Sequence, residues 1–182
     1  MLRTISSSTT TSMVRLDCSI NIPRTPPESA LQNGDHVTQE FERYYGTVFT
    51  SLLEEVPEVH IKRLGTSDSA YLLNESVGLY IKHATARVSP WSFTFRDSDF
   101  EVLNAMPKNL KDIAFALTCG FHGVCVISKL DFESTGGQFI GEPLRVTVRT
   151  VKGGSWTVSG TEGELKRTRS KTKPWEKFLN YL

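Results

Sequence analysis

The chain has 182 residues, of which 38% are hydrophobic and 23% charged, a composition typical of one globular domain with additional polar sequence. Its formal net charge is +1, so attraction to nucleic acid would have to come from a local group of basic residues. No apolar run is long enough to span a membrane, and we expect no membrane partner.

The three cysteines, Cys18, Cys119 and Cys125, are odd in number and lack Cys-x-x-Cys spacing. This pattern disfavours a disulfide framework or a zinc site and predicts a reducing, cytoplasmic location. The first 15 residues leave one alternative open, because they are rich in hydroxyl groups, contain Arg3 and Arg15, and carry no acid, as in an organelle transit segment.

Composition divides the chain into three segments. Residues 1–34 contain several prolines and the turn dipeptide Asn33-Gly34, and we expect a flexible arm in which residues 13–22 add one edge strand. Residues 35–160 are expected to form a single core domain. Residues 161–182 form a basic tail that contains Trp175.

The first half of the core domain begins with a helical pattern over residues 36–56, capped by Asp35 or Thr38 and ended by Pro57. The period then changes to that of β-strands, which we expect at 58–64, 69–74, 77–84 and 91–96. Residues 74–76 are predicted to form a hairpin turn between the second and third of these strands.

The second half begins with a short helix over residues 97–106, capped by Asp97 or Ser98. Residues 112–119 are continuously apolar, as in a central strand buried on both faces, and 124–130 return beside them. A short helix is expected over 128–135, and strands over 144–151 and 155–160. The pattern predicts an α/β or α+β fold with a single mixed central sheet flanked by helices.

Over roughly residues 35–135 this order of elements resembles the PD-(D/E)xK superfamily, which has the restriction-endonuclease-like fold. In that family the first helix carries a Glu. A hairpin follows, with an Asp before or on one strand and Glu-x-Lys at the end of the next. A polar, basic stretch, a helix and two strands complete the core.

The resemblance implies a role for several residues of this chain. Glu40 or Glu42 could be the Glu of the first helix, Asp68 the metal-binding and catalytic Asp, and Lys82 the catalytic Lys. The motif reads Tyr80-Ile81-Lys82, so a phenol stands where the second carboxylate belongs.

Family members with this acid on a neighbouring element are known, and Glu75 is the nearest candidate here. The implied metal ligands are therefore Asp68, Glu42 and Glu75, and the implied cofactor is Mg²⁺, which would polarise a phosphodiester and activate water. The alternative for Lys82 is a surface lysine that blunts a sheet edge, and for Asp68 an ordinary turn residue.

We therefore expect a nuclease-like domain that binds or acts on nucleic acid, either as a Mg²⁺-dependent phosphodiesterase or as an inactive relative. The basic residues expected to contact phosphates are Arg87, Lys166, Arg167, Arg169, Lys171 and Lys173. The alternative is a protein-interaction module that uses the sheet edge and the tail, whose Trp175 docks on this chain or on a partner.

Overall fold

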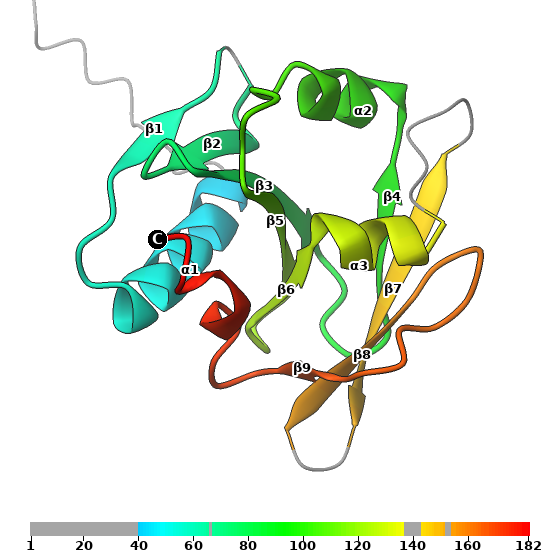
Figure 1. The fold of residues 1–182 in the computed structure, drawn as a ribbon. Coiled ribbons are helices and arrows are strands. Elements are labelled where there is room, and N and C mark those ends of the chain that lie inside the picture. The colour runs from blue at the N-terminus through cyan, green and yellow to red at the C-terminus, as the bar shows by residue number, and fades with distance from the viewer. Residues whose placement is uncertain (1–39, 66, 137–142, 152–153) are drawn as a thin grey trace, which may run out of the picture. The chain divides into compact units, whose positions relative to one another are not determined.

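Two β-sheets lie at the centre of the computed structural model (Figure 1). The structure describes residues 40–65, 67–136, 143–151 and 154–182, all within one compact unit, Thr38–Leu182. The predicted N-terminal arm, its edge strand over 13–22 and the helix caps Asp35 and Thr38 lie outside the described residues.

The first sheet, sheet A, has five strands in the order β1-β2-β3-β5-β6. They are β1 (Ile61–Arg63), β2 (Ala70–Leu73), β3 (Val77–Ala84), β5 (Asp112–Cys119) and β6 (Val124–Ser128). Strands β3 and β5 are parallel, and the other neighbours are antiparallel. The predicted hairpin turn joins β2 to β3, with Asn74 and Glu75 at positive φ, as the tight primed turns of hairpins require.

Both faces of sheet A are buried, which explains why β5 and β6 read as continuous apolar runs. On one face, Leu79, Ile81 and their neighbours pack against Val48 and Leu52 of helix α1 (Glu40–Glu55). Side chains of the opposite face, including Phe115, join a second apolar cluster. Helix α1 ends just before Pro57, as predicted.

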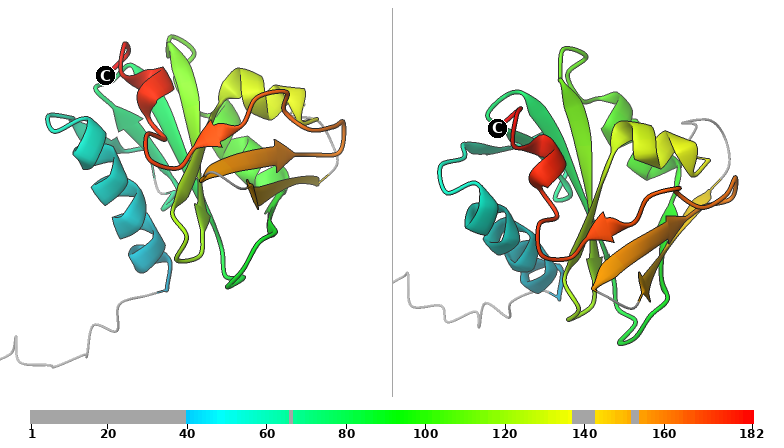
Figure 2. Two further views of the ribbon diagram at one scale, coloured as in Figure 1. Left: turned by 90° about the horizontal axis from the view of Figure 1, so that it is seen from below. Right: turned by 60° about the horizontal axis from the view of Figure 1, so that its bottom comes forward.

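The prediction of a single sheet is wrong, because four strands form a separate antiparallel sheet, sheet B. Its order is β4-β7-β8-β9, with β4 (Trp91–Phe95), β7 (Leu144–Val151), β8 (Ser155–Ser159) and β9 (Arg169–Ser170). Strands β4, β7 and β8 alternate between apolar and polar residues, so each has only one face to bury. That apolar face packs on sheet A, and Figure 2 shows sheet B and α1 on opposite sides of it.

Two short helices join these layers. Helix α2 (Asp97–Asn104) leads from β4 to β5, and α3 (Lys129–Ser134) follows β6 directly. The N-cap of α2 is Arg96 rather than Asp97 or Ser98. Both helices place an aspartate at the third helical position, where its carboxylate accepts a hydrogen bond from the backbone N–H of the N-cap residue.

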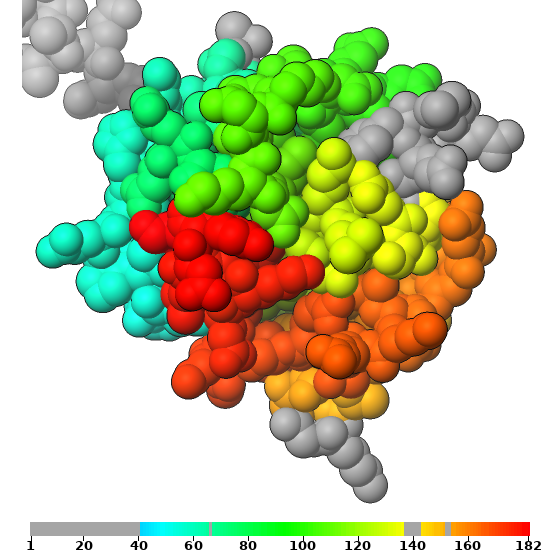
Figure 3. Space-filling view, viewed as in Figure 1, coloured from blue at the N-terminus to red at the C-terminus, as the bar shows by residue number. Residues whose placement is uncertain are grey.

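The C-terminal segment, residues 161–182, packs on the rest of the described chain (Figure 3). Strand β9 pairs with β8, and a 3₁₀ turn, Glu176–Phe178, follows. Trp175 is fully buried, and its indole N–H donates to the Ser51 hydroxyl of α1 at 2.8 Å. In the described part of the chain, no helix combines the length and apolarity needed to cross a bilayer.

We expect Trp175→Ala to lower the free energy of unfolding by about 3–5 kcal/mol, because it removes a buried indole and leaves a cavity between α1 and the C-terminal segment. The measurement is urea denaturation followed by circular dichroism. Leu179→Ala is the control, since Leu179 is 44% exposed in the same segment and should change stability by less than about 1 kcal/mol. Equal effects of the two variants would contradict the packing described here.

Candidate functional site

A cluster of three polar side chains lies near the carboxyl end of β3. Tyr80 and Lys82 alternate with Leu79 and Ile81, so they face away from α1. Both reach Asp99 in the first turn of α2: the Lys82 Nζ lies 2.6 Å from Asp99 Oδ1, and the Tyr80 hydroxyl donates to the same oxygen at 2.5 Å. Strand β3 and helix α2, which are separated in the sequence by β4, therefore form the cluster together.

The cluster is partly shielded from solvent, with the side chains of Lys82 and Asp99 23% and 13% exposed. The Lys82 ammonium also lies 5.1 Å from the centre of the Phe95 ring. The second carboxylate oxygen of Asp99 accepts the backbone N–H of Arg96 at 2.7 Å. Both oxygens of Asp99 are therefore engaged, and its negative charge is balanced by Lys82.

These contacts shift the acidity of two members of the cluster. Burial opposes ionisation of Asp99, but the hydrogen bonds from Lys82, Tyr80 and the Arg96 N–H outweigh it and hold the pKa of Asp99 below its ordinary value. Burial, followed by the hydrogen bond to Asp99, raises the pKa of Tyr80 far above its ordinary value. At neutral pH the cluster therefore contains a carboxylate and a neutral phenol.

The implied metal ligands Asp68 and Glu42 face the α1 side of sheet A, whereas the side chain of Lys82 faces away from it. Glu42 and Asp68 line one groove on the α1 side of sheet A, where Asp68 forms an ion pair with Arg63 of β1. Glu75 lies in the β2–β3 turn, seven residues and about 23 Å of extended strand from Lys82. Glu75 therefore lies at the far end of β3 from Lys82. The backbone of Asp68 runs close to the end of β3, because the Ile81 N–H donates to the Ser69 carbonyl. The three-ligand set stays a prediction. Only the backbone of Glu40 is described.

The described residues do not fit a Mg²⁺ ion at either place. They contain no group of three or more His, Cys, Asp or Glu side chains arranged to hold a metal. In the Lys82 cluster, Asp99 is the one carboxylate, it already accepts three hydrogen bonds, and the Lys82 ammonium beside it would repel a cation. In the groove, the carboxylate of Asp68 already forms an ion pair with the guanidinium of Arg63. The donor set gives no basis for a metal-dependent step.

The predicted basic residues are spread over different surroundings. Arg169 is bonded to Asp131 of α3 at 2.6 Å, and the Lys171 ammonium lies 4.1 Å from the centre of the Trp156 ring. Arg167 and Lys173 line a cavity of about 560 Å³ together with Asp131 and other residues of the segment. Lys166 and Arg87 are exposed, Lys166 in the C-terminal segment and Arg87 in the β3–β4 loop. Arg169 also lines the cavity, so three of the six predicted basic residues lie around it.

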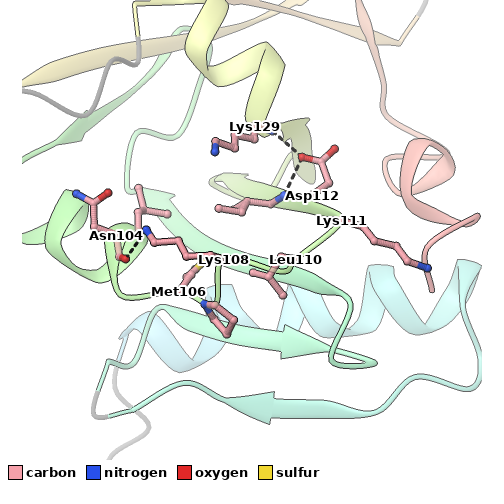
Figure 4. Close-up of a pocket in the computed structure, with 10 residues that line it drawn as sticks. Asn104, Met106, Lys108, Leu110, Lys111, Asp112 and Lys129 are labelled. Atoms are coloured by element: carbon pink, nitrogen blue, oxygen red, sulfur yellow. Dashed lines mark hydrogen bonds between the residues drawn. The ribbon is translucent and has the colours of Figure 1, made fainter.

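A separate pocket lies at the opposite end of β3 and β5, between α2 and α3 (Figure 4). Its volume is about 290 Å³, and its lining combines apolar residues such as Met106 and Leu110 with Lys108, Lys111 and Lys129. Asp112 accepts the backbone N–H groups of Ile113 and Lys129 through one oxygen. The carboxylate is therefore used to join the start of β5 to the start of α3.

Asp99 was not foreseen from the sequence as a partner of Lys82. The available signal was the Asp-Ser-Asp run at the start of the short helix, since an acid at the third helical position is a capping residue. The pattern does not reveal that β3 passes under this helix, because that contact depends on how β4 leads the chain back across sheet A.

Comparison with protein-family models, with curated proteins and with solved structures gives no match to this chain.

Asp99→Asn should lower the free energy of unfolding at neutral pH by about 1–3 kcal/mol, because it removes charge-assisted hydrogen bonds. The folded-state pKa of Asp99 lies below its value of about 3.9 in unfolded chains. Its contribution is therefore complete above that value and is lost as the pH falls through the folded-state pKa. The stability difference between wild type and variant should accordingly narrow as the pH falls below about 4.

Urea denaturation at several pH values measures this difference. Asp97→Asn is the matched control, because Asp97 is an exposed residue in the same helical turn. A difference that stays constant with pH for Asp99→Asn, or an equal effect of Asp97→Asn, would show that the cluster does not stabilise the fold electrostatically.

Proposed function

We propose that this chain is a nuclease-like domain that binds nucleic acid without metal-dependent hydrolysis, with Lys82 contacting a phosphate and Asp99 holding the lysine in place. The observation that supports the proposal most directly is the 2.6 Å contact between Lys82 and Asp99. It joins the lysine at the expected place on the third strand to an acid on a neighbouring element, as in PD-(D/E)xK proteins whose acid has moved.

The order of elements also supports the proposal. A first helix, three consecutive antiparallel strands, a second helix, and a strand parallel to β3 followed by its antiparallel neighbour agree with the order in that superfamily. Sheet B lies outside the resemblance except for β4, which occupies the interval between the lysine strand and the second helix.

Binding is favoured over hydrolysis because of the charges at the cluster. Lys82 and Asp99 neutralise each other, and Tyr80 is a neutral hydrogen-bond donor with a raised pKa. With a 23% exposed side chain, Lys82 retains a solvent-facing part that a phosphate oxygen can approach. A hydrolytic site would need an additional group to activate water.

We expect Lys82→Ala to weaken binding to a fluorescein-labelled oligonucleotide about tenfold, as the loss of one charge-assisted phosphate contact implies. The measurement is fluorescence anisotropy, with duplex and single-stranded DNA and RNA. Lys82→Arg should retain part of the affinity, since it keeps the cation. Lys62→Ala is the matched control, because Lys62 is an exposed lysine of β1.

The same oligonucleotides incubated with Mg²⁺ or Mn²⁺ test for hydrolysis. We expect no cleavage by the wild type. Cleavage that needs the metal and is lost in Lys82→Ala would contradict the proposal and show that the chain is a nuclease. Unchanged affinity of Lys82→Ala for the oligonucleotide would show that Lys82 does not contact a phosphate.

One observation favours a second function, protein–protein interaction. Phe121, in the turn between β5 and β6, is 92% exposed, and it borders a groove of about 280 Å³ lined also by Arg43, Tyr44 and Thr47. An exposed aromatic side chain beside a groove is typical of a protein-binding surface. Its position differs from the sheet edge and tail expected from the sequence.

Sedimentation velocity over a range of protein concentrations tests this surface for self-association. If a dimer forms through it, Phe121→Ser should shift the protein to monomer while leaving the circular dichroism spectrum unchanged. Persistence of the dimer in the variant would exclude Phe121 from the contact.

A further inference from the structure

The outward face of sheet B has an unusual composition. Successive residues of a strand point to opposite faces of the sheet. In sheet B, one set of side chains packs in the core and the intervening side chains point outward, and the core set includes Trp91, Phe93, Val146, Val148 and Trp156. On this outward face, Val151 at one end is apolar and the other residues of the four strands are polar. The polar residues are Ser92, Thr94, Arg145, Thr147, Arg149, Ser155, Thr157, Ser159 and Ser170.

The strand register places these side chains next to one another in rows. Thr94 of β4 lies opposite Arg145 of β7, and Arg149 of β7 lies opposite Thr157 of β8. Between these pairs, Thr147 has Ser92 on one side and Ser159 on the other. The two arginines are four residues apart on β7, about 13 Å along the strand, with hydroxyl groups between and beside them.

None of the outward residues on these four strands is acidic. Arg145 and Arg149 are exposed and form no ion pair within the described residues, and Arg149 donates to the Ser159 hydroxyl at 3.2 Å. Among the residues that the structure describes, Glu164 ends one of these rows, because it pairs with Ser159 in an antiparallel bridge. The whole chain has 20 acids and 21 Lys and Arg residues, so four strands with two outward arginines and no outward acid carry a local excess of positive charge.

This set of donors selects one kind of partner. Guanidinium and hydroxyl groups are the side chains that most often contact phosphate oxygens in nucleic-acid complexes. An extended sheet face suits a chain of phosphates lying across it, whereas a small ligand needs a concave site. In the described strands of sheet B, Val151 is the one apolar side chain that points outward. The face therefore also lacks the apolar centre that is typical of a protein interface.

We propose that the outward face of sheet B binds the sugar–phosphate backbone of nucleic acid, independently of base sequence, through Arg145 and Arg149 with the neighbouring hydroxyls. This inference rests on the proposed function, because the partner is again nucleic acid, but its residues differ from the Lys82 cluster and lie on the other side of sheet B. An experiment can therefore contradict one of the two binding sites and leave the other standing.

The test compares Arg145→Ser/Arg149→Ser with wild type in fluorescence anisotropy titrations of a labelled DNA duplex, its single strands and the corresponding RNA, at several KCl concentrations. We expect the double variant to bind at least about tenfold more weakly. The slope of log affinity against log salt should fall by about two, one for each lost phosphate contact. The loss should be similar for unrelated base sequences.

The matched control is Lys108→Ser/Lys111→Ser, which removes the same charge from exposed lysines of the pocket between α2 and α3. An equal loss in this control would overturn the proposal in favour of a general charge effect. Because Arg145 and Arg149 point outward, thermal unfolding of their double variant should match that of wild type. This comparison separates lost contacts from lost folding.

The remaining outcomes distinguish the two assignments. Binding lost in Lys82→Ala but intact in the double arginine variant overturns the sheet B proposal and keeps the proposed function. Binding that is intact in Lys82→Ala but lost in the double arginine variant supports the sheet B proposal and excludes Lys82 from phosphate binding. Failure of the wild type to bind any of the nucleic acids at low salt overturns both. Tighter, arginine-dependent binding to heparin than to every oligonucleotide overturns the assignment of nucleic acid as the partner.

Discussion

The carboxylate of Asp99 joins three parts of the fold. One oxygen accepts from Tyr80 and Lys82 of β3, and the other accepts from the Arg96 N–H at the junction of β4 and α2. The strand that enters sheet B, the helix that leaves it and the central strand of sheet A are therefore fixed to one another. Because all these donors favour the ionised form, the carboxylate stays charged in surroundings that would otherwise oppose ionisation.

Asp131 plays the corresponding part on the other short helix. It caps α3 through Ser128 and receives Arg169 at 2.6 Å and Lys177 at 3.4 Å from the C-terminal segment. Each short helix thus uses its third residue both to begin the helix and to hold a distant basic side chain. These contacts neutralise part of the positive charge of the C-terminal segment.

Much of the fold follows from residue patterns. The long helix, the hairpin at 74–76 and most strands could be predicted, since apolar residues recur with the period of a helix or a strand. The sequence also distinguished strands that are apolar throughout, such as β5, from strands that alternate, such as β7. That difference separates sheet A from sheet B, but the pattern does not say that the alternating strands pair only with one another, because pairing depends on contacts between distant segments.

The candidate site was less predictable for the same reason. Lys82 stood out as a lysine at the end of an apolar strand, and Tyr80 as a departure from the expected acid. Asp99 is 17 residues beyond Lys82 in the sequence, and the two side chains meet because the chain between them, which includes β4, leads back to β3. Glu75 was closer in sequence, yet it lies in the turn at the far end of the strand. Proximity along the chain was a poor guide to proximity in space.

The anchoring of α1 by Trp175 has a consequence for the order of folding. The hydrogen bond between Trp175 and Ser51 joins residues 124 positions apart, and the one from Asn74 to the Leu182 carbonyl joins residues 108 apart. Contacts of such separation are slow to form, because the chain must give up the entropy of a very long loop before they are made. We therefore expect hairpins and neighbouring strands to form first, and the outer layer of sheet A, α1 with the C-terminal segment, to form last.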